Sequence, residues 1–127
     1  MVVLSGCGME EQVWELRVRG DGEMTNETFV FDGRVAIGGN LENVSVSDVR
    51  VQFLTEDNTT IRTVRVGDFG GAARRENLTI RLNQTPQYIR VVAGEVELPE
   101  NARYGFSGLR RTDAGDYREY TQETTSA

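Results

Sequence analysis

The chain of 127 residues has the length of one domain and is long enough to bury a single hydrophobic core. Its net charge of −6 argues against a nucleic-acid partner, because binding to phosphates draws on clustered positive charge. No stretch after the first few positions reaches the ~18 apolar residues of a membrane-spanning helix.

The choice of basic and metal-binding residue types is unusual. All 14 basic residues are Arg, a bias that fits a GC-rich genome and also fits a protein of a high-salt environment, where abundant carboxylates maintain solubility. The chain contains no His, which rules out Ser-His-Asp and Cys-His catalytic arrangements and metal sites of the Cys/His type. The single Cys7 has no partner for an intramolecular disulfide. We therefore expect no metal, no cofactor and no enzymatic activity.

Residues 1–11 are interpreted as a lipid-attachment signal and a short tether. Leu4-Ser5-Gly6-Cys7 resembles a lipobox, at which a lipoprotein precursor is cut before the Cys and that Cys is then acylated. The alternative is that Cys7 is a small buried residue of an early strand. Gly6 and Gly8, which flank Cys7, suit a packed strand poorly and favour the lipobox.

The first predicted strand covers residues 12–19. Trp14, Leu16 and Val18 alternate with charged residues, as expected for a half-buried strand. Trp14 is expected in the core, with an exposed sugar-stacking platform as the alternative. Residues 20–23, Gly-Asp-Gly-Glu, predict a turn, and its two carboxylates are too few for the oxygen shell of Ca²⁺.

Residues 29–58 predict two strands joined by a loop. Phe29, Phe31, Val35 and Ile37 share one parity, and residues 38–40 supply turn residues. In the second strand the apolar parity changes after Val44 and Val46 to that of Val49, Val51 and Phe53. Such a change requires an inserted residue, so we predict a bulge at Ser47-Asp48. Residues 56–58 predict the following turn.

The remaining strands are predicted at residues 60–66, 78–82, 88–96 and 104–108, and the run at 88–96 has the composition of a central strand. Residues 66–73 predict a glycine-rich loop. Their Asp68-Phe69-Gly70 triplet matches a kinase motif, but the chain lacks the length and the lysine which that family needs. Residues 112–116 predict a turn, followed by either a last edge strand or a polar tail.

These patterns predict an all-β fold, an antiparallel β-sandwich of about seven or eight strands. Its domain would cover residues 12–111, with residues 112–127 as the tail or edge strand. The span from Phe31 to Asp57, which ends in VSVSDVRVQFLTED, resembles FxLYD-type domains, which implies an immunoglobulin-like sandwich outside the cytoplasm. Together with the lipobox and the acidic, Arg-only composition, the chain resembles small surface lipoproteins of salt-loving archaea.

Asn-x-Ser/Thr triplets are in excess. They begin at five of the seven Asn residues, where chance predicts about one. Turn-rich β proteins place Asn and Thr close together, which accounts for part of the excess. The candidate N-glycosylation sites are Asn26, Asn43, Asn58, Asn77 and Asn83.

Paired carboxylates are the remaining acid/base candidates. Glu95 and Glu97 lie on one face of a predicted strand, about 7 Å apart, a spacing like that of inverting glycosidases. Only Tyr88 and Tyr104 are near them as sugar-stacking residues, so a solvated strand face explains the pair better.

The expected function is a binding, adhesive or accessory module at the cell surface. It would be held to the membrane through Cys7 and would contact a surface protein or glycan. The alternatives are a surface protein that binds a solute or glycan in a pocket, and a subunit of a surface polymer assembled by strand exchange.

Overall fold

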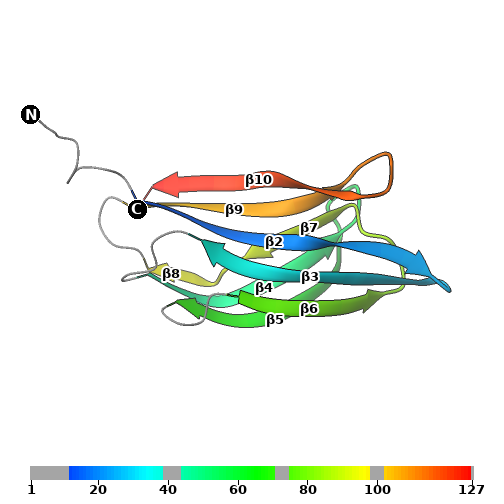
Figure 1. The fold of residues 1–127 in the computed structure, drawn as a ribbon, viewed down its shortest axis with the longest axis horizontal. Coiled ribbons are helices and arrows are strands. Elements are labelled where there is room, and N and C mark those ends of the chain that lie inside the picture. Colours follow the sequence, from blue (N-terminus) through cyan, green and yellow to red (C-terminus); the bar gives the residue numbers. More distant parts are fainter. Residues whose placement is uncertain (1–11, 39–43, 71–74, 98–101, 127) are drawn as a thin grey trace, which may run out of the picture.

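The structure is a computed structural model that describes residues 12–38, 44–70, 75–97 and 102–126. These residues form nine strands (Figure 1): β2 (Gln12–Thr25), β3 (Thr28–Gly38), β4 (Ser45–Leu54), β5 (Thr60–Gly70), β6 (Arg75–Leu82), β7 (Tyr88–Val92), β8 (Glu95–Glu97), β9 (Ala102–Arg111) and β10 (Tyr117–Ser126). Within the described ranges there is no helix with the length and apolar character needed to cross a membrane.

The strands form the predicted all-β sandwich, with nine strands among the described residues in place of the expected seven or eight. One layer contains β6, β3 and β2, and the other contains β5, β4 and β7, with β8 beside β4. Strand β9 joins the layers, because its first half pairs with β2 and its last residues pair with β7. The β2–β9 pairing is parallel, an exception to the expected antiparallel order. Strand β10 covers the other edge of β9 (Figure 1).

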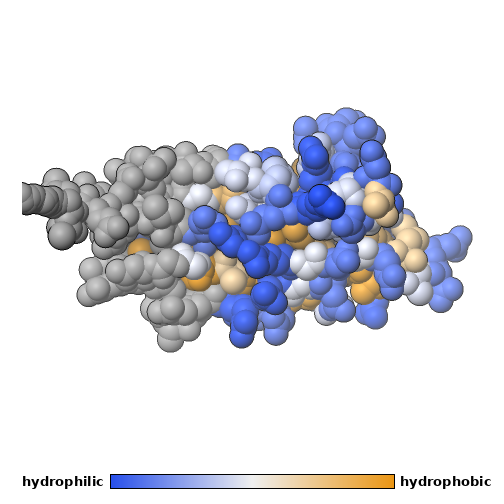
Figure 2. Space-filling model, turned by 45° about the horizontal axis from the view of Figure 1, so that its top comes forward, coloured by the Kyte–Doolittle hydropathy of each residue, from blue (hydrophilic) through white to orange (hydrophobic). Residues whose placement is uncertain are grey.

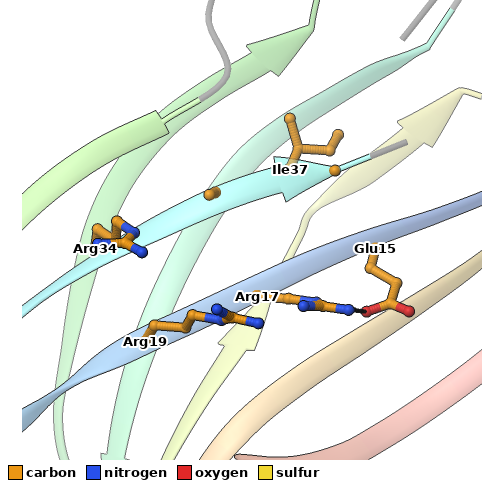
Figure 3. Close-up of a pocket in the computed structure, with 7 residues that line it drawn as sticks. Glu15, Arg17, Arg19, Arg34 and Ile37 are labelled. Atoms are coloured by element: carbon orange, nitrogen blue, oxygen red, sulfur yellow. Dashed lines mark hydrogen bonds and ion pairs between the residues drawn. The ribbon is translucent and has the colours of Figure 1, made fainter. Parts of the chain in front are cut away.

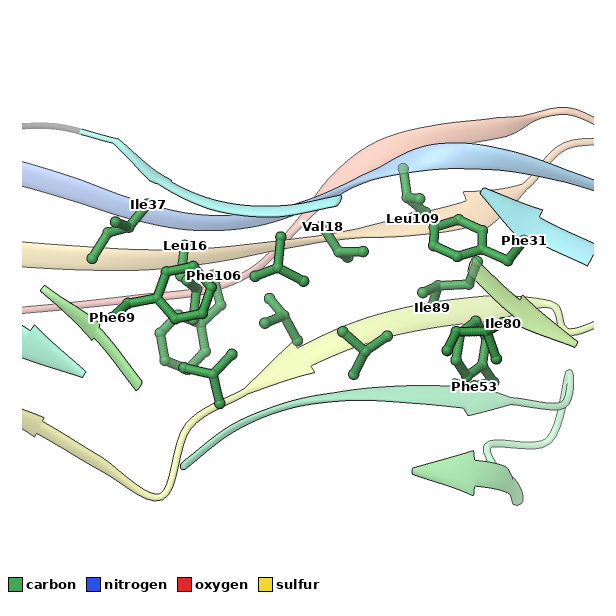
Figure 4. Close-up of a cluster of buried hydrophobic side chains, with 14 of the residues drawn as sticks. Leu16, Val18, Phe31, Ile37, Phe53, Phe69, Ile80, Ile89, Phe106 and Leu109 are labelled. Carbon is green, nitrogen blue, oxygen red and sulfur yellow. The ribbon is translucent and has the colours of Figure 1, made fainter. Parts of the chain in front are cut away.

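The core lies between the two layers and contains the residues that the two-residue periodicity selected. Leu16 and Val18 of β2, and Val49, Val51 and Phe53 of β4, have no solvent exposure. Figure 4 shows side chains from both layers pointing toward one another in this cluster. The layers therefore enclose one continuous apolar core, as expected for stacked sheets.

The predicted bulge at Ser47-Asp48 is confirmed. The register between β4 and β5 shifts between Val46 and Val49, and Asp48 has a φ of 56°. Both Val46 and Val49 are buried as a result. The carbonyl oxygens of Ser47 and Asp48 accept hydrogen bonds from the Gly94 amide at 3.0 and 3.2 Å, at the break between β7 and β8. One inserted residue thus keeps both halves of β4 on the core.

The prediction of a turn at residues 20–23 is wrong, because β2 runs through them to Thr25. Gly20 and Gly22 continue the inward parity of Leu16 and Val18. A Cβ at Gly22 would lie 2.2 Å from the Phe29 ring, and one at Gly20 would lie 2.4 Å from the Asp32 carbonyl oxygen and 3.0 Å from the Phe31 ring. The glycines therefore make room for two aromatic rings from β3.

The prediction of a loop at residues 66–73 is wrong over its first half. Strand β5 continues to Gly70, and Phe69 packs in the core. Residues 71–74 lie outside the described residues.

Residues 117–126 form strand β10, which decides between the two alternatives for the C-terminal segment. The buried Tyr117 hydroxyl donates a hydrogen bond to the Pro86 carbonyl oxygen at 2.6 Å, and its ring meets Phe29 edge-on at 6.0 Å. Burial raises the pKa of Tyr117. The side chain therefore ties the start of β10 to the core.

Four connections lie at the end of the sandwich where β2 stops, formed by residues 26–27, 55–59, 83–87 and 112–116 (Figure 1). We call this the turn end. In two of these connections a threonine hydroxyl donates to an aspartate, Thr55 to Asp57 and Thr112 to Asp116. These hydrogen bonds lower the pKa of both carboxyls.

Replacing Thr55 with valine is expected to move the pKa of Asp57 back toward its ordinary value, because the largest cause of the lowering is lost. A lowered pKa in the folded state contributes stability above the unfolded-state value of 3.8, and this contribution is lost as the pH falls through the folded-state pKa. A carboxyl-detected NMR titration checks the shift. Thr112→Val is the matched control: it should move Asp116 and leave Asp57 unchanged, and equal movement of both would contradict the assignment.

Candidate functional site

A hollow of about 360 Å³ opens on the solvent face of β2 and β3. Glu15, Arg17 and Arg19 of β2 line it together with Arg34, Ala36 and the last residues of β3. Figure 3 shows the arginine side chains on the outside of this strand pair. We call the site the arginine hollow.

The β2–β3 hairpin fixes which residues meet in the hollow. Asn26 and Glu27 both have positive φ, of 50° and 66°, as in the two-residue turns that favour tight hairpins. This turn sets a register in which Arg19 faces Arg34. Arg17 faces Ala36, whose small side chain leaves space between the arginines. The residues of β2 and β3 that alternate with them are buried, so the arginines must point outward.

Two of the three arginines already have carboxylate partners. Arg17 forms an ion pair with Glu15 on its own strand, and Arg19 Nε lies 3.1 Å from a Glu119 carboxylate oxygen on β10. Arg34 forms no ion pair with any residue in the described part of the chain. Its neighbour across the hairpin is Arg19, and like charges directly opposite each other are destabilising. Among the described residues, the hollow therefore holds one guanidinium without an ion-pair partner, that of Arg34, which we call the unbalanced guanidinium.

A second hollow, of about 490 Å³, lies further along the same strand pair and is acidic. Asp21 faces Asp32 in the register, and Glu23 also lines the space. Thr79 on β6 donates a hydrogen bond to Asp32 at 2.8 Å. Within the described ranges no cluster of three or more acidic, Cys or His side chains could hold a metal ion. Charge on this face is thus segregated, basic near the start of β2 and acidic toward the turn end.

On the face of the molecule drawn in Figure 2, hydrophilic residues cover much of the described surface, with smaller areas of hydrophobic residues between them. Among the described residues, Met24 is the exposed large hydrophobic side chain, at 47%. We find no broad apolar area on this view that competes with the arginine hollow as a candidate site.

The structure places four of the predicted glycosylation sites at exposed positions. Asn26 is in the β2–β3 turn, Asn58 in the β4–β5 turn with a φ of 66°, Asn77 on β6 and Asn83 directly after β6. Three of them, Asn26, Asn58 and Asn83, are at the turn end. Two predicted sites lie outside the described residues: Asn43 and the lipidation candidate Cys7.

The other singled-out residues do not converge on one site. Glu95 and Glu97 are exposed on β8, opposite Ser47 and Ser45 of β4. The Tyr88 ring lies 6.1 Å from that of Tyr120 in an edge-on pair, and burial raises the pKa of Tyr120. The side chains of Trp14 and Tyr104 lie outside the described part of the structure, although their backbones pair between β2 and β9.

The alternation over residues 12–19 predicts that Arg17 and Arg19 lie on the solvent face of a strand. It does not predict that they lie close to Arg34. The signal that could have found the hollow is the two-residue turn at Asn26-Glu27, since Thr25 and Thr28 on either side of it fix every later pair of the hairpin. Counting outward from that turn brings Arg19 opposite Arg34. A turn at residues 20–23 would have ended the strand before it reached Asn26, so the predicted turn gave no basis for this register.

Comparisons of the chain with protein-family models, with curated proteins and with solved structures give no match.

Proposed function

We propose that the protein is a binding module displayed on the outside of the cell and held to the membrane by a lipid on Cys7. Its role is to contact a surface protein or a glycan, and it carries out no reaction. The sequence features that support this are the lipobox-like Leu4-Ser5-Gly6-Cys7 and the excess of N-glycosylation triplets.

The observation that carries the proposal is the position of three of those triplets relative to the start of β2, the strand that follows Cys7 in the sequence. Cys7 precedes β2 by only a few residues, and β2 then extends over 14 residues, about 45 Å, toward the turn end. Asn26, Asn58 and Asn83 are exposed and belong to the connections at that end. A sandwich tethered at the start of β2 would point these three sites away from the membrane, where attached glycans meet no lipid.

Mass spectrometry of the protein purified from its native cells tests the proposal. We expect a mass increase from acyl chains on a peptide that begins at Cys7, and glycan masses on peptides that contain Asn26 or Asn58. Asn101, which is not in a glycosylation triplet, serves as an internal control and should stay unmodified. A native chain that retains an unmodified Cys7 and bare Asn residues would overturn the proposal.

A second candidate, a surface protein that captures a solute, is favoured by the arginine hollow. Its volume lies at the lower end of the range for small-molecule sites. The two candidates are compatible, because the hollow lies on the side of the sandwich and leaves the turn end free.

A further inference from the structure

We infer that the arginine hollow binds a small organic acid through one carboxylate group. A hexuronic acid has the size that fits the hollow. The inference names a ligand class for the proposed binding role and rests on it. Three observations on β2 and β3 carry it: an unbalanced guanidinium, a space of suitable size, and neighbouring carboxylates that would repel a ligand with further negative charges.

The unbalanced guanidinium belongs to Arg34. It is exposed, forms no ion pair with any described residue, and faces Arg19 across the hairpin. A guanidinium presents a planar fork of donors that matches the two oxygens of a carboxylate. Because Glu15 and Glu119 already pair with the other two arginines, Arg34 is the guanidinium that remains for the carboxylate of a ligand.

The space is created by Ala36. This residue faces Arg17 in the register and lines the hollow between the arginines of the two strands. A volume of about 360 Å³ is sufficient for a single ring with its substituents. The small side chain of Ala36 leaves room for the ring beside β3 while the carboxylate reaches Arg34.

The neighbouring carboxylates exclude an extended polyanion. Asp21 and Asp32 face each other two residues further along the same strands. A polymer with repeated negative charges would meet this pair of carboxylates and be repelled. A phosphate with two negative charges would likewise exceed the one unbalanced guanidinium. A ligand with a single negative charge avoids both the repulsion and the excess of negative charge.

The test is isothermal titration calorimetry of the full chain with glucuronate, glucose, acetate and inorganic phosphate at low ionic strength. We expect glucuronate to bind more tightly than each of the other three, because it alone combines the single carboxylate with a ring that fills the hollow. Glucose lacks the charge, and acetate and phosphate lack the ring.

Three variants locate the binding. Arg34→Gln should weaken glucuronate binding about tenfold or more, since a charge-assisted hydrogen bond is lost. Ala36→Leu should weaken it to a similar degree by filling the hollow without changing charge. Arg118→Gln is the matched control: it removes the same charge from an exposed side chain on β10 that does not line the hollow, and it should leave the affinity unchanged.

A folding readout separates a binding role from a structural one. The melting temperature of Arg34→Gln should equal or exceed that of the parent, because the facing Arg19 loses a like-charged neighbour. A lower melting temperature together with weaker binding would indicate a structural role for Arg34 and overturn the assignment.

The remaining outcomes distinguish failure of the proposed ligand class from failure of the proposed surface role. Equal binding of phosphate and glucuronate, or equal losses in Arg34→Gln and Arg118→Gln, would overturn the ligand class. An acylated, glycosylated native protein that ignores glucuronate would overturn only this inference and leave the surface role standing. Glucuronate binding by a chain that is unmodified in its native cells would support the inference and overturn the surface role.

Discussion

Replacing Phe31 with alanine is expected to lower the free energy of unfolding by about 3 to 5 kcal/mol. A domain of this size has a total stability of about 5 to 15 kcal/mol, so the variant should be close to unfolding at elevated temperature. The effect should be among the largest of any single truncation, because this ring connects the two layers of the sandwich.

The contacts of Phe31 explain the magnitude. Its ring has no solvent exposure and meets the Phe53 ring of the opposite layer edge-on, with centroids 5.7 Å apart. On its own layer the ring lies against Gly20 and Gly33, which face each other in the β2–β3 register. Neither glycine has a side chain that could fill the space left by the ring. The cavity should therefore persist, and its cost adds to the lost burial.

Urea denaturation followed by circular dichroism measures this loss. Phe31→Leu keeps most of the buried volume and should cost less than Phe31→Ala. Met24→Ala is the control, since Met24 is the exposed apolar side chain of the same hairpin and its truncation should change stability by no more than about 0.5 kcal/mol. If Phe31→Ala unfolds at the same urea concentration as Met24→Ala, the ring does not join the layers.

Two-residue periodicity was sufficient to predict most of this fold. The alternation of Leu16 and Val18 with charged residues, and of Leu78, Ile80 and Leu82 with polar ones, identified strands whose apolar sets do face the core. The change of parity within β4 also identified the bulge at Ser47-Asp48. These features are local: each follows from which face of a strand must be buried, and it needs no knowledge of the partner strand.

Predictions failed where a glycine leaves space for a side chain of another strand. Gly20 and Gly22 resemble turn residues, but in the structure they accept the rings of Phe31 and Phe29 from the neighbouring strand. The same short sequence can therefore form a turn or part of a packed strand, and the neighbouring strand determines which of the two forms. The sequence around residue 117 was ambiguous for a similar reason, because the hydroxyl of Tyr117 bonds to Pro86, which is 31 positions away.

The arginine hollow depended on the same missing information. Arg34 and Arg19 are unremarkable as separate residues on two solvated strand faces. Their opposition follows from the register of the hairpin, which the structure supplies. Lipidation at Cys7 and glycosylation of the Asn residues, by contrast, are predictions from local motifs, and they stay predictions for mass spectrometry to decide.

Replacing Gly108 with alanine is expected to cost about 3 kcal/mol or more, because it would disturb the point at which β9 changes partners. Ser107 of β9 pairs with Arg17 of β2, whereas Leu109 pairs with Ile89 of β7. Beyond Ile89, β7 has therefore lost β9 as a neighbour on that side. The backbone groups of Val91 need another partner there.

The side chain of Gln122 supplies that partner. Its amide oxygen accepts a hydrogen bond from the Val91 N–H at 2.9 Å, and its amide nitrogen donates to the Val91 carbonyl at 2.8 Å. The register shift between Thr121 and Glu123 in β10 coincides with this inward reach of Gln122. One side-chain amide thus takes the place of a strand residue beside β7.

Gly108 is required because the Gln122 side chain passes over it. A Cβ at Gly108 would lie 2.5 Å from the Gln122 amide oxygen and 2.6 Å from the Ile89 carbonyl oxygen. The side chain of Gln122 could move away, but the Ile89 carbonyl belongs to the β7 backbone and could not do so cheaply. Alanine at this position should therefore both displace the amide and strain the β7–β9 pairing.

Gln122→Ala alone should cost about 2 kcal/mol, since it leaves a backbone donor and acceptor without a partner. The double variant Gly108→Ala, Gln122→Ala should cost less than the sum of the two single variants, because removing the amide also removes one of the two clashes. Urea denaturation gives the three free energies, and hydrogen exchange at the Val91 amide reports directly on the lost bond. Gln84→Ala, at an exposed position after β6, is the control for loss of a glutamine side chain. Strictly additive costs, or Val91 exchange that is unchanged in Gln122→Ala, would mean that Gln122 does not pair with β7 in solution.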